Sequence, residues 1–313
     1  MVVSMLRAST LTLVERAESV AADHGGVLGR RQLAALGVHR DVVARLVRDR
    51  RWSTCGRWSV VTHCGAVEGR GLMWRAVHEV GAGARVDGLS ALVAAGVTGL
   101  THDVVHVSVH MLQRSPTVPG VKVHKVSRVL PDDELTTGLP RTRPALASLR
   151  AAQWAVSDRQ AALFLVAPVQ QRLVTGRQLV EAHERYRGRC RRALVERLIA
   201  DIVDGAQALG ELDLARLCRG RGLPAPERQA VVQGRGGRCY LDARWQAGLV
   251  VEVDGAQHQQ GLTPVDDMLR HNNVAIEDDM VLRIPLVGMR LCPEAFLDQI
   301  ERALRRLALR GGR

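Results

Sequence analysis

The first sixty residues carry apolar positions at helical spacing, interrupted by glycines. An apolar stripe runs from Leu11 to Ala22 and predicts a first helix. Residues 25–38 begin with a glycine turn and continue as a short second helix that ends at Gly37. A third helix is predicted over residues 39–52, with an apolar face made by Val42, Val43, Leu46 and Val47. Residues 51–61 predict two short strands on either side of Gly56.

The polar face of the third predicted helix is rich in arginine. Five arginines lie mostly off its apolar face: Arg40, Arg45, Arg48, Arg50 and Arg51. Three helices followed by a hairpin are the plan of a winged helix-turn-helix, in which the third helix enters the major groove and the hairpin is the wing. We therefore predict a DNA-binding domain over residues 1–65, with contacts from Arg40, Arg45, Arg48 and Arg51. The alternative is a small helical docking domain whose basic face is simply solvated.

Residues 66–205 predict a mixed α/β middle domain. Residues 104–111 and 120–126 alternate apolar and polar side chains like half-buried strands. A loop then leads into a helix entered near Pro144, and helical patterns continue to Ile202. Three histidines lie in the strand-like runs, and we expect them to be structural rather than metal ligands: His106, His110 and His124.

Residues 206–313 give the clearest pattern and predict a third domain. The expected order is αβββαβα, and its elements are helix 209–222, strands 228–233, 239–245 and 249–255, helix 264–276, strand 280–287 and helix 293–309. The predicted fold class is therefore a multidomain α/β protein.

Charge separates the front of the chain from its back. The 313 residues have a net charge of +12. Residues 1–60 hold ten arginines and five acids, residues 61–200 hold nineteen basic residues and eleven acids, and residues 201–313 hold fifteen arginines and sixteen acids. A basic front suits phosphate binding, so duplex DNA is the expected partner. The alternative is a general enrichment of solvated arginine.

Cysteine usage and hydropathy favour a cytoplasmic protein. The six cysteines are scattered without CxxC spacing, so a zinc site is not expected. No signal peptide and no apolar run of about 18 residues is present. We expect no membrane association, and reduced thiols.

Two acids are predicted to oppose each other in the hairpin of residues 239–255. Three residues separate Trp245 from Leu249, an ordinary hairpin loop. If these two residues pair, Asp242 lies opposite Glu252 and Tyr240 lies opposite Asp254, all on one face of the sheet. Directly opposed carboxylates about 5 Å apart repel each other unless a cation lies between them.

Such a cluster of carboxylate oxygens suits Mg²⁺ or Mn²⁺. An acid from the preceding predicted helix, Glu211 or Asp213, could complete the cluster. The alternative is a solvated sheet face on which the acids bind nothing.

The acid-bearing strands resemble a known nuclease superfamily. The segments "YLDARW", "LVVEVDGAQH", "DDMLRHN" and "MVLRIP" resemble the Vsr-like domain of unknown function 559, within the PD-(D/E)XK restriction-endonuclease-like superfamily. This resemblance covers roughly residues 209–307. The front segment "HGGVLGRRQLAALGVHRDVVARLVRDRRW" more loosely resembles the winged-helix N-terminus of AbiEi-type antitoxins.

The resemblance implies roles for particular residues. Asp242 and Glu252 match the metal-binding acids, with Glu211 as a third ligand, and Asp254 stands where the superfamily motif has its lysine. His258 matches a histidine that could transfer a proton. Arg270 and Arg283 match the arginines of the next helix and strand. The back domain has no lysine, which departs from the superfamily pattern.

Two functions follow as expectations. The first is a magnesium- or manganese-dependent DNA endonuclease positioned on duplex DNA by the N-terminal domain. The second is a non-enzymatic, antitoxin-like transcriptional regulator with a degenerate nuclease fold, acting with a partner toxin or as a homodimer.

Overall fold

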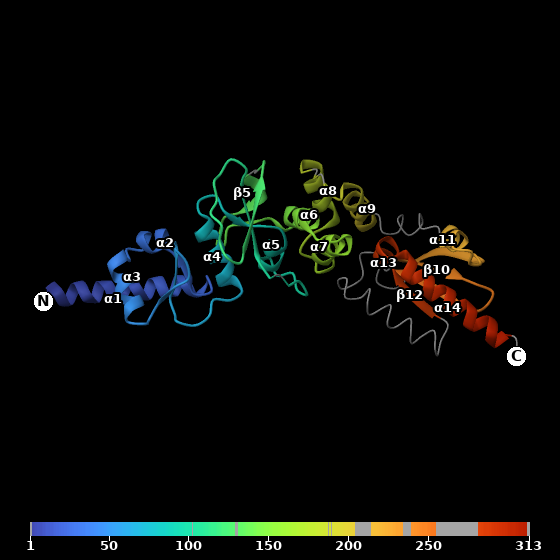
Figure 1. Ribbon diagram of the computed structural model, residues 1–313, viewed down its shortest axis with the longest axis horizontal. Coiled ribbons are helices and arrows are strands. Elements are labelled where there is room, and N and C mark those ends of the chain that lie inside the picture. The colour runs from blue at the N-terminus through green and yellow to red at the C-terminus, as the bar shows by residue number, and fades with distance from the viewer. Residues whose placement is uncertain are drawn as a thin grey trace. The chain divides into compact units, whose positions relative to one another are not determined.

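The fold is mixed α/β, with helices and small sheets in both halves of the chain (Figure 1). The computed structural model describes residues 2–101, 103–128, 131–186, 188, 190–203, 214–233, 239–254 and 281–311. The chain divides into two compact units, Met1–Arg143 and Pro144–Arg313. The predicted middle region, residues 66–205, is divided between them: its strands and its first two helices belong to the first unit, and its helices from Pro144 onward belong to the second. The three-domain division stays a prediction.

The first unit begins with three helices and a three-stranded sheet. Its elements are α1 (Val2–Ala22), β1 (Val27–Gly29), α2 (Arg30–Ala35), α3 (Arg40–Arg48), β2 (Ser53–Thr54) and β3 (Ser59–Val61). The strands are antiparallel in the order β1-β3-β2, so the hairpin β2–β3 is joined to the start of α2 through β1. The predicted glycine turn at residues 25–26 is present, but it leads into β1 before the second helix begins.

One apolar core holds these elements together. Ala17 and Ala21 of α1, Leu33 of α2 and Leu46 of α3 are all buried in it, together with Trp52. This is the burial that the helical apolar stripes predict, because each helix turns a single face inward. Burying each of the two leucines contributes about 1.5–3 kcal/mol, and the burial directs the opposite faces of the helices toward solvent.

The rest of the first unit is a five-stranded mixed sheet with two helices. Its elements are α4 (Arg70–Val80), β4 (Arg85–Val86), α5 (Gly88–Ala94), β5 (Val105–His110), β6 (Val121–Val126), the short 3-10 helix η1 (Pro131–Asp133), β7 (Glu134–Leu135) and β8 (Arg141–Thr142). The strand order is β6-β5-β4-β8-β7. The two predicted strands of this region are confirmed, and they pair in parallel. Helix α4 contacts β1, β3, β4 and β5, so it lies between the two sheets of the unit.

The second unit opens with four helices: α6 (Pro144–Trp154), α7 (Asp158–Gln170), α8 (Gly176–Arg185) and α9 (Arg192–Val203). Side-chain caps explain where two of them begin. The Ser157 hydroxyl accepts a hydrogen bond from the Gln160 amide at the start of α7. Thr175 and Gln178 form a reciprocal capping box at the start of α8.

A four-stranded sheet with flanking helices completes the second unit. Its elements are α11 (Leu214–Gly220), β9 (Arg228–Gln233), β10 (Cys239–Arg244), β11 (Val250–Asp254), β12 (Val281–Pro285), α13 (Leu286–Leu291) and α14 (Pro293–Gly311). The strand order is β12-β11-β10-β9, antiparallel except for the parallel pair β11 and β12. The predicted strands agree with β9 to β12 to within one residue at the described ends, with one exception. The strand predicted over residues 280–287 ends at Pro285, and its last two residues begin α13. The helix predicted over residues 264–276 lies outside the described residues.

Candidate nucleic-acid interface and acidic strand pair

Helix α3 has the exposed basic face that the sequence predicts. Val43 and Leu46 are buried, whereas Arg40, Arg45 and Arg48 are exposed. The Arg40 guanidinium lies 3.5 Å from the Asp41 carboxylate, with both side chains more than 90% exposed. An ion pair this exposed contributes about 0–1 kcal/mol, so it leaves Arg40 available to an outside anion. Within the described residues, Arg45 and Arg48 have no ion-pair partner.

Arg51, the fourth predicted DNA contact, lies in a different environment. Its guanidinium lies 3.2 Å from the carboxylate of Glu18 on α1. The same carboxylate oxygen accepts a hydrogen bond from the indole N–H of Trp52 at 2.9 Å. Arg51 therefore joins the end of the α3 segment to α1, and any contact with a phosphate would compete with this ion pair.

The turn between β2 and β3 carries an exposed aromatic and basic tip. Trp58 is 47% exposed, and the guanidinium carbon of Arg57 lies 5.0 Å from the centre of its ring. Arg30, at the start of α2, donates a hydrogen bond from Nε to the Arg57 carbonyl at 3.0 Å. The tip is thus tied to α2 and presents an exposed cationic group.

Helix α4 holds this turn in place through a buried carboxylate that sequence reasoning did not identify. The backbone N–H groups of Arg57 and Trp58 donate to Glu79 at 2.9 and 2.8 Å, and the Ser59 hydroxyl donates at 2.6 Å. Glu79 is only 8% exposed. A side chain at Gly56 would overlap the Glu79 carboxyl group, so the glycine permits this close approach. The signal in the sequence was an acid inside the apolar pattern of residues 70–80.

The acid pair of the second unit has the predicted backbone register. Asp242 of β10 pairs with Glu252 of β11, and Tyr240 pairs with Asp254. The Trp245 amide donates to the Leu249 carbonyl at 3.0 Å, which closes the predicted three-residue loop. This part of the prediction is confirmed, because the loop length and the alternation of side chains together define the register.

A cation already lies beside Glu252. The guanidinium of Arg283, on the neighbouring parallel strand β12, lies 3.3 Å from the Glu252 carboxylate. Both side chains are partly exposed, Glu252 at 26% and Arg283 at 48%. This ion pair reduces the repulsion that Glu252 would otherwise experience from an opposed carboxylate, and no metal is needed for that reduction.

Most of the other predicted site residues lie outside the described residues. This applies to Glu211, Asp213, His258 and Arg270, and to the side chains of Asp242 and Asp254. Among the residues that the structure describes, no group of three His, Cys, Asp or Glu side chains could hold a metal ion. The magnesium or manganese site therefore stays a prediction.

Two of the three strand histidines of the first unit, His106 and His124, interact with each other. The rings of His106 and His124 are stacked, with centroids 5.0 Å apart, and His124 Nε2 lies 3.0 Å from His106 Nδ1. In the register of the parallel strands β5 and β6, His106 lies opposite Lys122 and His124 lies opposite Ser108, so the two histidines are diagonal neighbours. This contact between the two rings agrees with the structural role expected for them.

No protein-family model and no curated protein matches the sequence, so the resemblances described above stay predictions. Among solved structures, the chain is similar to the crystal structure of the RV2827C protein from Mycobacterium tuberculosis, at 16% identity. The match covers 62% of this chain and 76% of that chain, with a TM-score of 0.37. This similarity is too weak to indicate a shared function.

Within the described parts of the chain, no helix is long and apolar enough to cross a membrane.

Five of the six cysteines are described as free thiols: Cys55, Cys64, Cys190, Cys218 and Cys292. Burial raises the pKa of the Cys218 thiol to about 11, which makes it a poor nucleophile at neutral pH.

Proposed function

We propose that the chain is a duplex-DNA-binding protein whose N-terminal residues act as a winged helix-turn-helix. The observation that carries the proposal is the exposed arginine face of α3. The order α1-β1-α2-α3-β2-β3, with the sheet order β1-β3-β2, suits this role, since α3 follows α2 after a short turn and the hairpin flanks it.

In this proposal α3 enters the major groove, and the β2–β3 turn is the wing. Arg40, Arg45 and Arg48 contact phosphates and base edges, while Arg57 at the tip of the turn contacts the neighbouring backbone. Arg51 has a smaller role, because Glu18 already neutralises its charge. Glu79 acts as a positioning residue, since its hydrogen bonds set where Arg57 and Trp58 lie.

The test is duplex-DNA binding by the full chain, measured by fluorescence anisotropy at several salt concentrations. Arg45→Ala and Arg48→Ala should each weaken binding on most sequences and lower the salt slope by about one. Arg177→Ala, which removes an exposed arginine of α8 in the second unit, is the matched control. The proposal fails if the full chain does not bind duplex DNA, or if binding does not depend on salt.

A second candidate function, metal-dependent DNA cleavage, is favoured by the opposed register of Asp242 and Glu252. Asp242, Glu252 and Glu211 would hold Mg²⁺ or Mn²⁺, with Asp254 nearby. The ion would supply a Lewis acid for a phosphodiester. His258 would transfer a proton, and Arg283 would have to release Glu252 or share it.

The alternative to cleavage is a non-enzymatic regulator acting with a partner toxin or as a homodimer. The Glu252–Arg283 ion pair favours this alternative, because the guanidinium occupies one side of the carboxylate that a metal would use. Incubation of plasmid DNA with the purified protein and Mg²⁺ or Mn²⁺ separates the two. Cleavage that is lost in Glu252→Gln supports the nuclease, and the absence of cleavage with intact DNA binding supports the regulator.

A further inference from the structure

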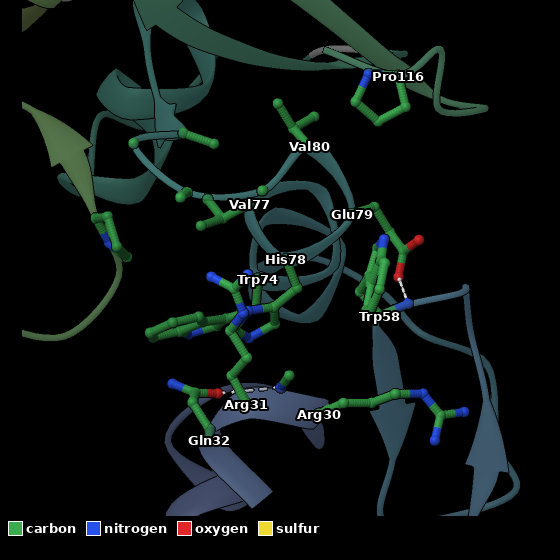
Figure 2. Close-up of a pocket in the computed structure, with 16 residues that line it drawn as sticks. Arg30, Arg31, Gln32, Trp58, Trp74, Val77, His78, Glu79, Val80 and Pro116 are labelled. Carbon is green, nitrogen blue, oxygen red and sulfur yellow. Dashed lines mark hydrogen bonds between the residues drawn. The ribbon is translucent and has the colours of Figure 1, made fainter. Parts of the chain in front are cut away.

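A cavity of ≈470 Å³ lies within the first unit, beneath the β2–β3 turn. The start of α2, helix α4 and the loop after α4 line it, and Figure 2 shows the lining residues. Its volume is within the range of about 300–1,000 Å³ that is typical of small-molecule sites. The cavity is therefore large enough for a ligand of one or two aromatic rings.

The walls are mainly apolar and aromatic. They include Trp58, Trp74, Val77, Val80, Pro116 and Pro140. Trp74 is also part of an aromatic stack, with its ring centre 3.8 Å from that of His24 and 5.4 Å from that of His78. Flat rings on the wall favour a flat ligand, because offset stacking and edge contacts need matching planes.

Two polar atoms of lining residues have no hydrogen-bond partner among the described residues. They are Nε1 of Trp74, a side chain that is only 4% exposed, and Nε2 of His78. An indole N–H can only donate, and leaving such a donor buried without an acceptor costs about 1–3 kcal/mol. A ligand that brings an acceptor into the cavity recovers this free energy on binding.

The charge available at the cavity is positive. Arg31 is exposed, and Figure 2 shows its side chain extending from α2 toward Trp74 and His78. The carboxylate of Glu79 also borders the cavity, but this carboxylate already accepts hydrogen bonds from the amides of the β2–β3 turn. Burial, reinforced by the charge of His24, lowers the pKa of His78 to about 4, so this imidazole is neutral at pH 7.

We propose that this cavity binds a small planar aromatic carboxylate, and that binding of this ligand lowers the affinity of the protein for duplex DNA. The ring lies against the apolar walls, and the carboxylate accepts hydrogen bonds from the Trp74 indole and from Arg31. The second half of the proposal rests on the proposed function. A carboxylate that neutralises Arg31 removes a positive charge from α2. Trp58 belongs both to the cavity lining and to the β2–β3 turn, so a bound ligand contacts the turn directly.

Ligand binding is tested first without DNA, by calorimetry on the full chain. The probes are benzoate, 2-naphthoate and indole-3-carboxylate, each paired with its neutral amide. At least one acid should bind about tenfold more tightly than its amide, since a charged hydrogen bond to Arg31 contributes more than a neutral one. If no acid binds at about 1 mM, or if the amides bind as tightly as the acids, the proposal is overturned.

Variants locate the site. Trp74→Phe keeps an aromatic ring but removes the donor, and Arg31→Gln removes the charge. Each should weaken binding of the best acid by about fivefold or more. Trp154→Phe and Arg177→Gln, which lie outside the cavity lining, are the controls and should leave binding unchanged. Equal binding by parent, Trp74→Phe and Arg31→Gln would place the ligand elsewhere and overturn the assignment.

The coupling to DNA is tested separately. The best acid at saturation should raise the Kd for duplex DNA by about tenfold, and DNA should weaken binding of the acid by the same factor. Arg31→Gln should remove most of this effect. Acid binding without any change in DNA affinity overturns the regulatory half. Acid binding by a chain that fails to bind DNA leaves the cavity assignment intact and refutes the proposed function instead.

Discussion

Two glutamates, one in each unit of the chain, show how the surroundings of a carboxylate determine its role. Glu79 of α4 is buried, and three donors of the β2–β3 turn occupy its oxygens. Glu252 of β11 is partly exposed, faces Asp242 in the register and forms an ion pair with Arg283. The Glu79 carboxylate fixes the position of the β2–β3 turn through these hydrogen bonds. The Glu252 carboxylate is partly exposed, so a ligand from solvent could reach it.

The difference also separates stability from function. A buried carboxylate with complete hydrogen bonding is costly to alter, because its donors cannot find other partners in the interior. Substitution of a partly exposed carboxylate near another acid changes the stability little, because water can replace its contacts. Substitutions at the two positions should therefore give opposite patterns of stability and binding.

Glu79→Gln should cause the largest loss of stability. The amide keeps one acceptor oxygen but places an NH₂ group where one donor of the turn now binds. Two donors then face each other in a buried site, and we expect a loss of about 2–4 kcal/mol. Thermal unfolding followed by tryptophan fluorescence should show a lower midpoint for the first unit. DNA affinity should fall with it, since the turn loses its anchor.

The control for this change is Glu184→Gln, an exposed glutamate of α8 in the second unit. It should melt like the parent. A Glu79→Gln protein with parental melting and parental DNA affinity would show that the turn does not depend on α4.

The acidic hairpin could be predicted from the sequence because local rules determine it. A three-residue loop and strict alternation fix which residues oppose each other, and both are visible in residues 239–255. The first three helices of the first unit were predictable for the same reason, since one apolar stripe defines each buried face. In both cases the decisive contacts are close in sequence.

The features that escaped prediction depend on contacts between distant residues. Strand β1 has only three residues, too few for a periodic signal, and it forms by pairing with β3 about thirty residues later. The role of Glu79 depends on a turn about twenty residues earlier in the chain. Arg283 reaches Glu252 only through the parallel pairing of β12 with β11.

Acidification should destabilise the first unit by a smaller amount. The His78 pKa is about 4 in the folded protein, against 6.5 for an unperturbed histidine, and burial also lowers the pKa of His24. Between pH 4 and pH 6.5 the unfolded chain binds more protons than the folded protein. The contribution of neutral His78 to the free energy of unfolding is therefore fully present above about pH 6.5 and declines toward pH 4. We expect a loss on the order of 2–3 kcal/mol for His78. Urea unfolding at several pH values measures it.

The variant His78→Gln provides the comparison, because glutamine does not titrate. Its unfolding free energy should change less between pH 7 and pH 4 than that of the parent. A direct titration of the His78 ring by NMR gives a second measure. A His78 ring that titrates near pH 6.5 would show that protonating it does not destabilise the folded protein, and would contradict this prediction.

The smallest effect is expected for Glu252→Gln without metal. The change removes one side of the ion pair with Arg283, which destabilises the protein slightly, and it removes repulsion from the opposed Asp242, which stabilises it slightly. Both contributions involve partly exposed groups, so the net change should stay below about 1 kcal/mol. Melting of the second unit without metal measures this balance.

Added metal then separates the two functions proposed for the second unit. If Glu252 is a ligand, Mg²⁺ or Mn²⁺ at about ten times its Kd should stabilise the parent by about 1.4 kcal/mol, because only the folded state binds it. Glu252→Gln should lose that stabilisation, and any cleavage of DNA should disappear with it. Glu227→Gln, a change at the residue just before β9, controls for a general effect of lost charge. A parent whose midpoint ignores both metals would indicate that Arg283 is the lasting partner of Glu252, and the regulator would then be the better account of the second unit.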